Sequence, residues 1–263
     1  MKPVTVATLL QKKVNNEKFS VLAAYDAIFA RAINQAGIDA ILVGDSLGMV
    51  LQGNDSTVPV TIEDMQYHTR CVSLGNSHSL VIADMPFMTY SNTPDAIAAA
   101  RSLMQAGAHM IKMEGGQYLS NTISTLVAGG IPVCAHIGLT PQTVNTLGGY
   151  KVQGRGDTQA QHLIDDAIAL EKAGAQIILM ECVPAEVAKR VEAAVSVPTI
   201  GIGAGKETTG QVLVLHDMLG LNSQPAKFVK NFMQDADSIQ SALSNYHQAV
   251  ILGEFPAAEH CFK

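Results

Sequence analysis

The sequence contains no tryptophan, and aromatic residues occupy only 5% of its 263 positions. A hydrophobic core must therefore be built mainly from aliphatic side chains. Charged residues are also scarce, at 15% against 48% apolar residues. This balance excludes a natively disordered chain, because disorder requires few apolar and many charged residues. No apolar run reaches the roughly 18 residues of a membrane span, so we expect a folded domain that does not enter a membrane.

Paired cysteines and an excess of basic residues are missing as well. The four cysteines are widely spaced and form no CxxC pair, which favours reduced thiols and a cytoplasmic location. The first residues lack a long apolar stretch and a small-residue cleavage site, so we expect no signal peptide. With 17 basic and 23 acidic residues the net charge is −6, which argues against nucleic acid as a partner. Small molecules are the expected partners.

Glycine, by contrast, is abundant at 22 residues, and it marks a phrase that occurs three times. The copies read AGIDAILVGDS from Ala36, AGAHMIKMEGG from Ala106 and AGAQIILMECV from Ala173. Each copy follows an amphipathic stretch, and its glycine suits the left-handed position after a helix. The apolar run that follows is typical of a buried parallel strand. Whether the copies share an origin or only the common α/β pattern, each predicts a helix, a glycine, a strand and then an acid.

Five more strands are predicted from short apolar runs between breakers, at 19–25, 79–84, 131–136, 198–203 and 211–216. Helical patterns lie between most strands, at 26–36, 61–75, 94–106, 117–129, 160–173 and 184–196, with further helices at 5–16 and 237–252. Eight strands in strict alternation with helices predict a single (β/α)8 TIM barrel over residues 1–263. A doubly wound sheet would need a glycine fingerprint after the first strand, where the sequence reads Tyr25-Asp26-Ala27 instead.

Polar residues stand at the ends of the predicted strands, where barrels of this type place their active sites. They are Asp45, Ser46, Asp84, Lys112, Glu114, His136, Glu181 and His216. Four carboxylates in one concavity repel one another and raise one another's pKa values. A divalent cation together with Lys112 is the simplest way to balance them. Oxygen ligands without Cys-His pairs at ligand spacing favour Mg²⁺ over Zn²⁺.

Each of these residues also has a purely structural interpretation. The two aspartates could cap helices, Lys112 and Glu114 could form a buried ion pair, and His136 could be a core histidine. Asp84, however, precedes Met-Pro, where the chain stays extended. Glu181 follows the apolar run QIILM, which does not suit a surface charge. These apolar neighbours are expected to raise the pKa of Glu181 towards the working pH, as a general base requires.

Glycine also marks two long connections and a short turn. The connections, 46–60 and 138–157, are predicted to be lids over the site. The GIGAG run at 201–205 fits a tight turn better than a phosphate loop.

Several long strings occur in order along the chain: LVGDSLGM (42–49), QGNDSTVPVT (52–61), ADMPFM (83–88), AHIGLTPQ (135–142), GGYKVQGRG (148–156), LMECVP (179–184) and HDMLG (216–220). Together they resemble the ketopantoate hydroxymethyltransferase family over the whole chain. The resemblance implies a cytoplasmic TIM-barrel enzyme that typically forms a homodecamer. It implies transfer of a one-carbon unit from 5,10-methylenetetrahydrofolate to 3-methyl-2-oxobutanoate, the first step of pantothenate biosynthesis. Residues 221–232 are the least family-like part.

The resemblance also implies roles for individual residues. One Mg²⁺ per subunit would be bound by Asp45 and Asp84, with Glu114 nearby. The keto acid would be held by Asp45, Ser46, Asp84 and Lys112, and Glu181 would be the catalytic base. From its position at a strand end, His136 is expected to hydrogen-bond the enolate region of the substrate.

Two other classes remain open at this stage. A metal-dependent lyase of the isocitrate lyase and phosphoenolpyruvate mutase type also has an acidic Mg²⁺ site in a barrel. Such enzymes commonly carry a lysine-lysine-cysteine-glycine-histidine run, whereas this chain reads Val133-Cys134-Ala135-His136. An oligomeric binding or scaffold protein is the non-enzymatic alternative, and it gives no reason for four acids at the strand ends.

Overall fold

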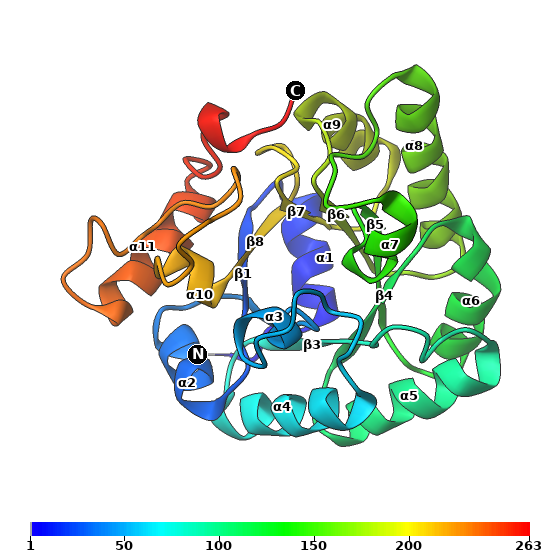
Figure 1. Cartoon of the computed structure of the whole chain (residues 1–263), viewed down its shortest axis with the longest axis horizontal. Helices are drawn as coiled ribbons and strands as arrows, with labels where there is room; N and C mark the ends of the chain where they lie inside the picture. Colours follow the sequence, from blue (N-terminus) through cyan, green and yellow to red (C-terminus); the bar gives the residue numbers. More distant parts are fainter. Residues whose placement is uncertain (1) are drawn as a thin grey trace.

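Eight parallel strands form a closed barrel in a computed structural model that describes residues 2–263 (Figure 1). The strands are β1 (Phe19–Ala23), β2 (Ala40–Val43), β3 (Leu80–Asp84), β4 (Met110–Glu114), β5 (Val133–Gly138), β6 (Ile177–Glu181), β7 (Thr199–Ile202) and β8 (Gly210–Val214). The barrel closes where β8 pairs with β1, with Gly210 opposite Phe19. A Cβ atom at Gly210 would overlap the Phe19 ring, so glycine is required at this point of closure. The predicted TIM barrel is confirmed.

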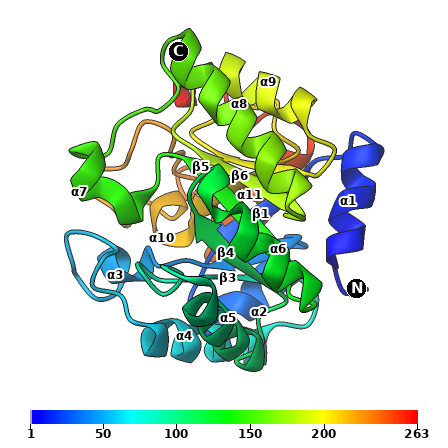
Figure 2. The same cartoon turned by 90° about the vertical axis from the view of Figure 1, so that its right-hand side faces the viewer.

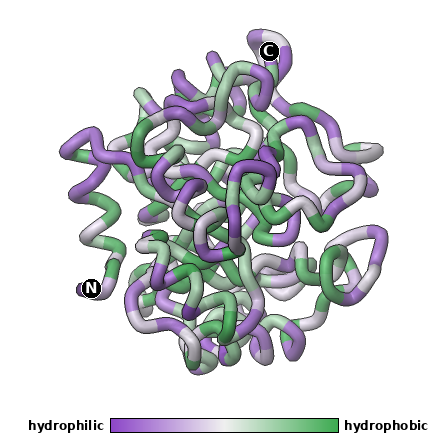
Figure 3. The backbone as a smooth tube through the Cα atoms, turned by 90° about the vertical axis from the view of Figure 1, so that its left-hand side faces the viewer, coloured by the Kyte–Doolittle hydropathy of each residue, from purple (hydrophilic) through white to green (hydrophobic). Residues whose placement is uncertain are grey.

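Helices surround the barrel and cover one of its ends. The larger ones are α1 (Val6–Val14), α2 (Ala27–Gln35), α4 (Ile62–Gly75), α5 (Thr93–Gln105), α6 (Ser120–Ala128), α8 (Asp157–Lys172), α9 (Ala185–Ala194) and α11 (Ile239–Ile251). Figure 2 shows α1 at one end of the barrel and the short helices α3 (Leu47–Val50) and α7 (Val144–Leu147) at the opposite end. In Figure 3 the helix beside the N-terminus changes from hydrophilic to hydrophobic from turn to turn. Its buried residue, Leu9, faces the core.

The repeated glycines have the predicted conformation. Gly37, Gly107 and Gly174 follow α2, α5 and α8, with φ angles of 79°, 109° and 107°. Residues with a Cβ rarely adopt this left-handed region. Each glycine therefore ends a helix and turns the chain into the next buried strand.

The predicted strict alternation is wrong at one place, because no helix lies between β7 and β8. Residues 203–209 cross from one strand to the next as a turn, with Gly203 and Gly205 at positive φ. A Cβ at Gly203 would meet the rings of Phe228 and Phe262, so other segments of the chain cover this turn. The GIGAG run is thus a tight turn with close approaches. The two expected lids also contain short helices: α3 in the first, and η2 (Pro141–Thr143) with α7 in the second.

Hydrophobicity alone gives no sign of a membrane segment. Within residues 2–263, no helix combines the length and apolarity that crossing a bilayer requires.

Candidate active site

A cavity of about 380 Å³ opens at the carboxyl ends of the strands. Its wall includes all but one of the polar strand-end residues expected at the site: Asp45, Ser46, Asp84, Lys112, Glu114, His136 and Glu181. Apolar side chains from the barrel interior, among them Leu42 and Leu179, complete the floor. Lys112, Glu114 and Glu181 therefore all lie at the cavity.

The two aspartates are buried side by side. Asp84 ends β3, and its Oδ2 accepts a hydrogen bond of 3.0 Å from the backbone N–H of Asp45. Neither side chain caps a helix, since the N-cap of α3 is Ser46, without a side-chain cap bond, and α5 is capped by Asn92. Burial, with the nearby charges of Asp84 and Glu114, raises the pKa of Asp45 well above its usual value. A second negative charge beside Asp84 is therefore unfavourable here.

Lys112 is the cation of the site. Its Nζ lies 2.8 Å from Asp84 Oδ1 and 3.4 Å from Glu114 Oε1. Burial disfavours the ammonium, but Asp84, Glu114 and Asp45 outweigh burial and raise the pKa of Lys112. Lys112 is consequently charged throughout the physiological pH range. Besides the expected Glu114, it contacts Asp84.

Glu114 is held on both of its oxygens. Oε1 lies near Lys112 and 3.3 Å from His136 Nδ1, while Oε2 accepts from the backbone N–H of Gln142 at 3.1 Å. Burial favours the neutral acid, yet Lys112 and His136 prevail and lower the pKa of Glu114 to about 2. Glu114 therefore acts as a fixed anion.

His136 lies between two glutamates. Its Nδ1 is 3.3 Å from Glu114 Oε1 and its Nε2 is 3.5 Å from Glu181 Oε2. Neither ring nitrogen has a hydrogen-bond partner among the described residues, although the side chain is buried. Burial lowers the pKa of His136, so the ring is neutral near pH 7. A satisfied core histidine would have partners, and this one is instead available to a bound molecule.

Glu181 is the carboxylate whose pKa is moved towards neutrality. It ends β6, and burial together with the charge of Glu114 raises its pKa to about 8. Its side chain keeps 18% of its surface exposed, against 1% for Glu114. Within one cavity, therefore, Glu114 is a permanent anion and Glu181 can exchange a proton near physiological pH.

Gln142 is a site residue that the sequence analysis missed. Its Nε2 donates to Asp45 Oδ2 at 2.8 Å and to Met85 O at 2.9 Å, and its Oε1 accepts from the Tyr90 hydroxyl. Every group of the amide is thus engaged. The only sequence signal was its place in the AHIGLTPQ string, whereas its partners come from distant parts of the chain.

Tyr25 is a second missed residue. Its hydroxyl lies 2.8 Å from Ser46 Oγ, and its side chain is buried. The sequence placed His216 at the end of the eighth strand. β8 ends at Val214, and the His216 ring lies 5.7 Å from the Tyr25 ring, outside the cavity wall. Its Nδ1 is buried and has no partner among residues 2–263. The structure therefore brings together all the predicted residues except His216.

The donor set can be tested against Mg²⁺. Among residues 2–263, no group of three His, Cys, Asp or Glu side chains is arranged as a ready set of metal ligands. Asp45 and Asp84 provide two adjacent buried carboxylates at the cavity wall. The residues therefore fit a hard cation bound by two carboxylates, with substrate and water oxygens completing its coordination. Zn²⁺ suits this lining poorly, since it prefers histidine and cysteine ligands and the cavity wall holds one histidine and no cysteine.

The two predicted lids meet at the mouth of the cavity. Met49 and Thr57 come from the first connection, and Pro141 and Tyr150 from the second. The Tyr150 hydroxyl lies 3.6 Å from the Met49 sulfur. Residues from both connections therefore frame the entrance.

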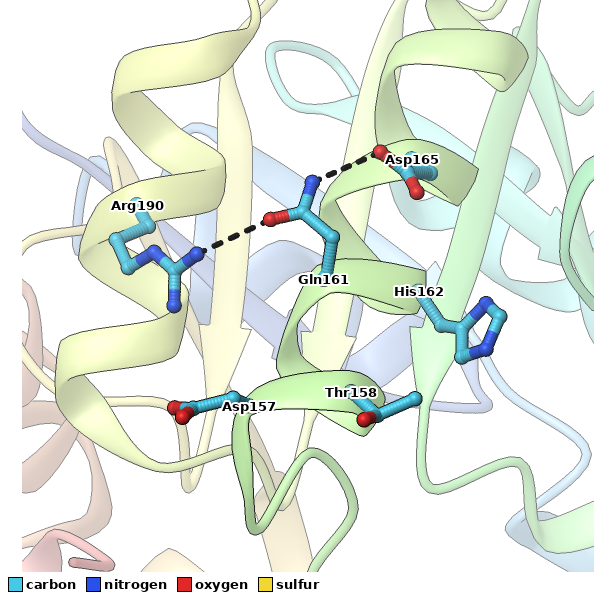
Figure 4. A pocket seen from close by; sticks show the side chains of 6 residues that line it. All are labelled: Asp157, Thr158, Gln161, His162, Asp165 and Arg190. Carbon is cyan, nitrogen blue, oxygen red and sulfur yellow. Dashed lines mark hydrogen bonds between the residues drawn. The ribbon is translucent and has the colours of Figure 1, made fainter.

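A groove on the outer surface can be set aside. It lies between α8 and α9 and is lined by Asp157, Thr158, Gln161, His162, Asp165 and Arg190, as Figure 4 shows. All six residues are exposed. Gln161 is bonded to Asp165 at 2.9 Å and to Arg190 at 3.3 Å. No buried reactive group lines this groove.

Comparison with known proteins gives a consistent result. The family model described as ketopantoate hydroxymethyltransferase matches residues 3–258. The 3-methyl-2-oxobutanoate hydroxymethyltransferase of Colwellia psychrerythraea (strain 34H / ATCC BAA-681) is 57% identical over 100% of both chains. That of Marinobacter nauticus (strain ATCC 700491 / DSM 11845 / VT8) is 56% identical over 99% of both.

Among solved structures, a phosphonopyruvate hydrolase aligns with a TM-score of 0.63 at 15% identity, covering 83% of this chain and 84% of that one. A 2,3-dimethylmalate lyase aligns with a TM-score of 0.58 at 18% identity, covering 80% of each chain. Identities this low show only that the barrel fold is shared.

Proposed function

The chain belongs to the ketopantoate hydroxymethyltransferase family, and from this membership we propose that it transfers a hydroxymethyl group from 5,10-methylenetetrahydrofolate to 3-methyl-2-oxobutanoate in an Mg²⁺-dependent reaction. The product would be 2-dehydropantoate, the first intermediate of pantothenate biosynthesis. The observation that carries this proposal is the pairing, in one cavity, of Glu181 at a pKa of about 8 with two buried aspartates beside Lys112.

Glu181 would start the reaction by removing the C3 proton of the keto acid. A base works best when its pKa lies near the operating pH, and Glu181 meets this condition while Glu114 does not. The electron pair of the broken C–H bond passes into the enolate. His136, neutral and 3.5 Å from Glu181, would donate a hydrogen bond to the substrate beside the base.

Lys112 would bind the negative charge that the substrate brings and gains. The keto acid carries one carboxylate, and enolisation moves further charge onto its keto oxygen. Asp45 and Asp84 would hold the Mg²⁺ ion, which would supply Lewis acidity. Lys112 adds a fixed ammonium that needs no reorganisation as charge develops.

The carbon–carbon bond would then form between C3 of the substrate and the methylene carbon of the folate. Both bonds from that carbon to the folate nitrogens N5 and N10 break, and one water molecule supplies the oxygen of the new hydroxymethyl group. Three protons are available, one from C3 by way of Glu181 and two from the water, and three are taken up, one by the new hydroxyl and one by each folate nitrogen. Tetrahydrofolate then leaves, and atoms and charge balance.

Deuterium exchange at C3 isolates the first step, because enolisation needs no folate. With Mg²⁺ and the keto acid in deuterated water, we expect the wild-type protein to exchange the C3 proton. Glu181→Gln should lose exchange but retain keto-acid affinity, and Asp84→Ala should lose Mg²⁺ affinity measured by calorimetry. Full exchange by Glu181→Gln would reassign the base, with His136 next in line, and normal Mg²⁺ affinity of Asp84→Ala would refute the metal assignment.

We also propose a homodecamer located in the cytoplasm, on the basis of the family resemblance. Exposed apolar side chains on the outer helices, including Ile28, Tyr67 and Leu74, are available for contacts between subunits. Light scattering should detect a particle of ten 27.8 kDa chains.

A further inference from the structure

One carboxylate of the cavity has no part in the keto-acid chemistry. Asp217 lies in α10 (Leu215–Met218), directly after β8, and lines the same cavity as Glu181. It is half-buried, and burial raises its pKa. Among the described residues it has no ion pair with a lysine or arginine, and no group donates to its Oδ2. An acceptor oxygen is therefore free within the cavity.

The following loop fixes the orientation of this carboxylate. The backbone N–H of Gln224 donates to Asn222 Oδ1 at 2.9 Å. This contact turns the Asn222 amide so that its Nδ2 donates to Asp217 Oδ1 at 3.0 Å. Both Asn222 and Gln224 also line the cavity, so the loop that departs most from the family pattern contributes to its wall.

Apolar side chains line the same cavity. Ala226 and Phe228 follow Asn222 along the chain and line the wall, and Met49 and Tyr150 line it from the two lids. The Phe228 ring packs edge-on against Phe262 with centroids 6.5 Å apart, which holds it in place. An oriented carboxylate among apolar side chains is a suitable site for a flat, uncharged heterocycle.

We propose that Asp217, oriented by Asn222, binds the 2-amino-4-oxopyrimidine edge of the reduced folate, an inference that rests on the proposed function. This edge presents two adjacent donors, the ring N3–H and the 2-amino N–H, which match the two oxygens of a carboxylate.

Binding of tetrahydrofolate to Asp217→Asn tests the proposal. The amide of asparagine keeps the shape of the carboxylate but loses its charge and places a donor against a donor. We expect calorimetry to show a loss of tetrahydrofolate affinity of about ten- to a hundredfold. The KM for methylenetetrahydrofolate should rise by a similar factor, while the KM for the keto acid stays close to the wild-type value. Asn222→Ala should lose several-fold, and Asp157→Asn, which removes an exposed carboxylate outside the cavity, should lose nothing.

A ligand change makes the test specific to the contact. Removal of the 2-amino group from tetrahydrofolate should weaken binding to the wild-type protein and have little further effect on Asp217→Asn. Equal losses in the two proteins, or wild-type affinity in both Asp217→Asn and Asn222→Ala, would overturn the proposal.

The proposed function fails in a distinguishable way. A wild-type protein that exchanges the C3 proton yet binds no tetrahydrofolate would remove the folate donor and this inference together, and it would leave keto-acid activation in place. Normal wild-type turnover with unchanged folate binding by Asp217→Asn would overturn only the inference.

Discussion

At the scale of single residues, the site assigns different roles to chemically similar groups through their surroundings. Glu114 and Glu181 have the same side chain and lie on either side of His136. Lys112 lies 3.4 Å from Glu114 and holds its pKa at about 2, whereas Glu181 has no close cation and its pKa rises to about 8. Glu114 is therefore a permanent anion, and Glu181 can act as a base.

Lys112 provides the first residue-scale prediction. Lys112→Ala should weaken keto-acid binding and slow turnover together, because the ammonium neutralises both the bound carboxylate and the developing enolate. We expect a loss in kcat/KM on the order of a hundredfold. Lys112→Arg should recover only part of it, since a planar guanidinium cannot replace a compact charge 2.8 Å from Asp84 in a buried site. Steady-state kinetics with varied 3-methyl-2-oxobutanoate measures both parameters.

Lys112→Met separates catalysis from mere ion pairing. If Lys112 only neutralised its acidic neighbours, this variant would lower the melting temperature and leave the Michaelis constant unchanged. A raised Michaelis constant at a preserved melting temperature supports the substrate role.

Gln142 provides the second prediction, as a positioning residue for Asp45. Gln142→Leu removes the donor to Asp45 Oδ2 and leaves the Tyr90 hydroxyl without its acceptor, so the carboxylate loses its fixed orientation. Such outer contacts typically change metal affinity or activity by about 10- to 100-fold. Calorimetric titration with Mg²⁺ should show this loss, and Tyr90→Phe should show a smaller one. Gln153→Leu, in the same connection but bonded only to Lys151 O, is the matched control and should behave as wild type.

At the scale of elements, the parallel strands determine which residues meet. Each strand ends at the same rim of the barrel, so acids far apart in the chain become neighbours. This is why the sequence alone could predict Asp45, Asp84, Lys112, Glu114 and Glu181. The periodicity of an apolar strand shows which side of it faces inward, and a polar residue at its end is conspicuous.

The residues that could not be predicted lie on loops. Gln142 is 97 positions from Asp45, and nothing local in its sequence reports that contact. Tyr25 resembles any other aromatic residue at a strand end until the structure places it against Ser46. The helical patterns of the sequence already left the connection between β7 and β8 without a helix, but its coverage by Phe228 and Phe262 could not be predicted, because it depends on packing between distant segments.

A glycine provides the prediction at this scale. Gly107 ends α5 at a φ of 109°, and a Cβ there would overlap the Ser73 side chain of α4. Gly107→Ala should therefore lose about 1–3 kcal/mol of stability from backbone strain alone. The matched control is Gly130→Ala, with a φ of 86° and no neighbour within 4 Å of its Cβ, so it carries strain without the clash. Chemical denaturation should rank wild type above Gly130→Ala and Gly130→Ala above Gly107→Ala, and equal losses would show that the Ser73 contact is unimportant.

At the scale of the whole molecule, the barrel stabilises a site that is unfavourable on its own. Aliphatic strands and their covering helices bury four carboxylates around one lysine, and this burial raises the pKa values of Asp45 and Glu181. Stability and function are therefore in conflict at the mouth, and the conflict has a measurable dependence on pH.

The pH dependence of stability follows from the direction in which the pKa of Glu181 is shifted. Its pKa rises from about 4.5 in the unfolded chain to about 8 in the folded one, so between these values the folded state binds more protons. Stability from Glu181 is therefore fully present below about pH 4.5, falls as the pH rises through this window, and is constant above it. His136 acts in the opposite direction below pH 6.5, since burial lowers its pKa, so wild-type curves alone would mix the two effects.

Comparison with Glu181→Gln isolates the contribution. In ligand-free protein, the difference in unfolding free energy between Glu181→Gln and wild type should grow in favour of the variant from pH 5 to pH 8, by on the order of a few kcal/mol. Urea denaturation at several pH values measures it, with Glu186→Gln on the exposed start of α9 as a control that should show no trend. Mg²⁺ with the keto acid should raise the wild-type stability at pH 8, since ligands that bind only the folded state stabilise it. A difference independent of pH would mean that Glu181 titrates normally, and the base would then have to be sought elsewhere in the cavity.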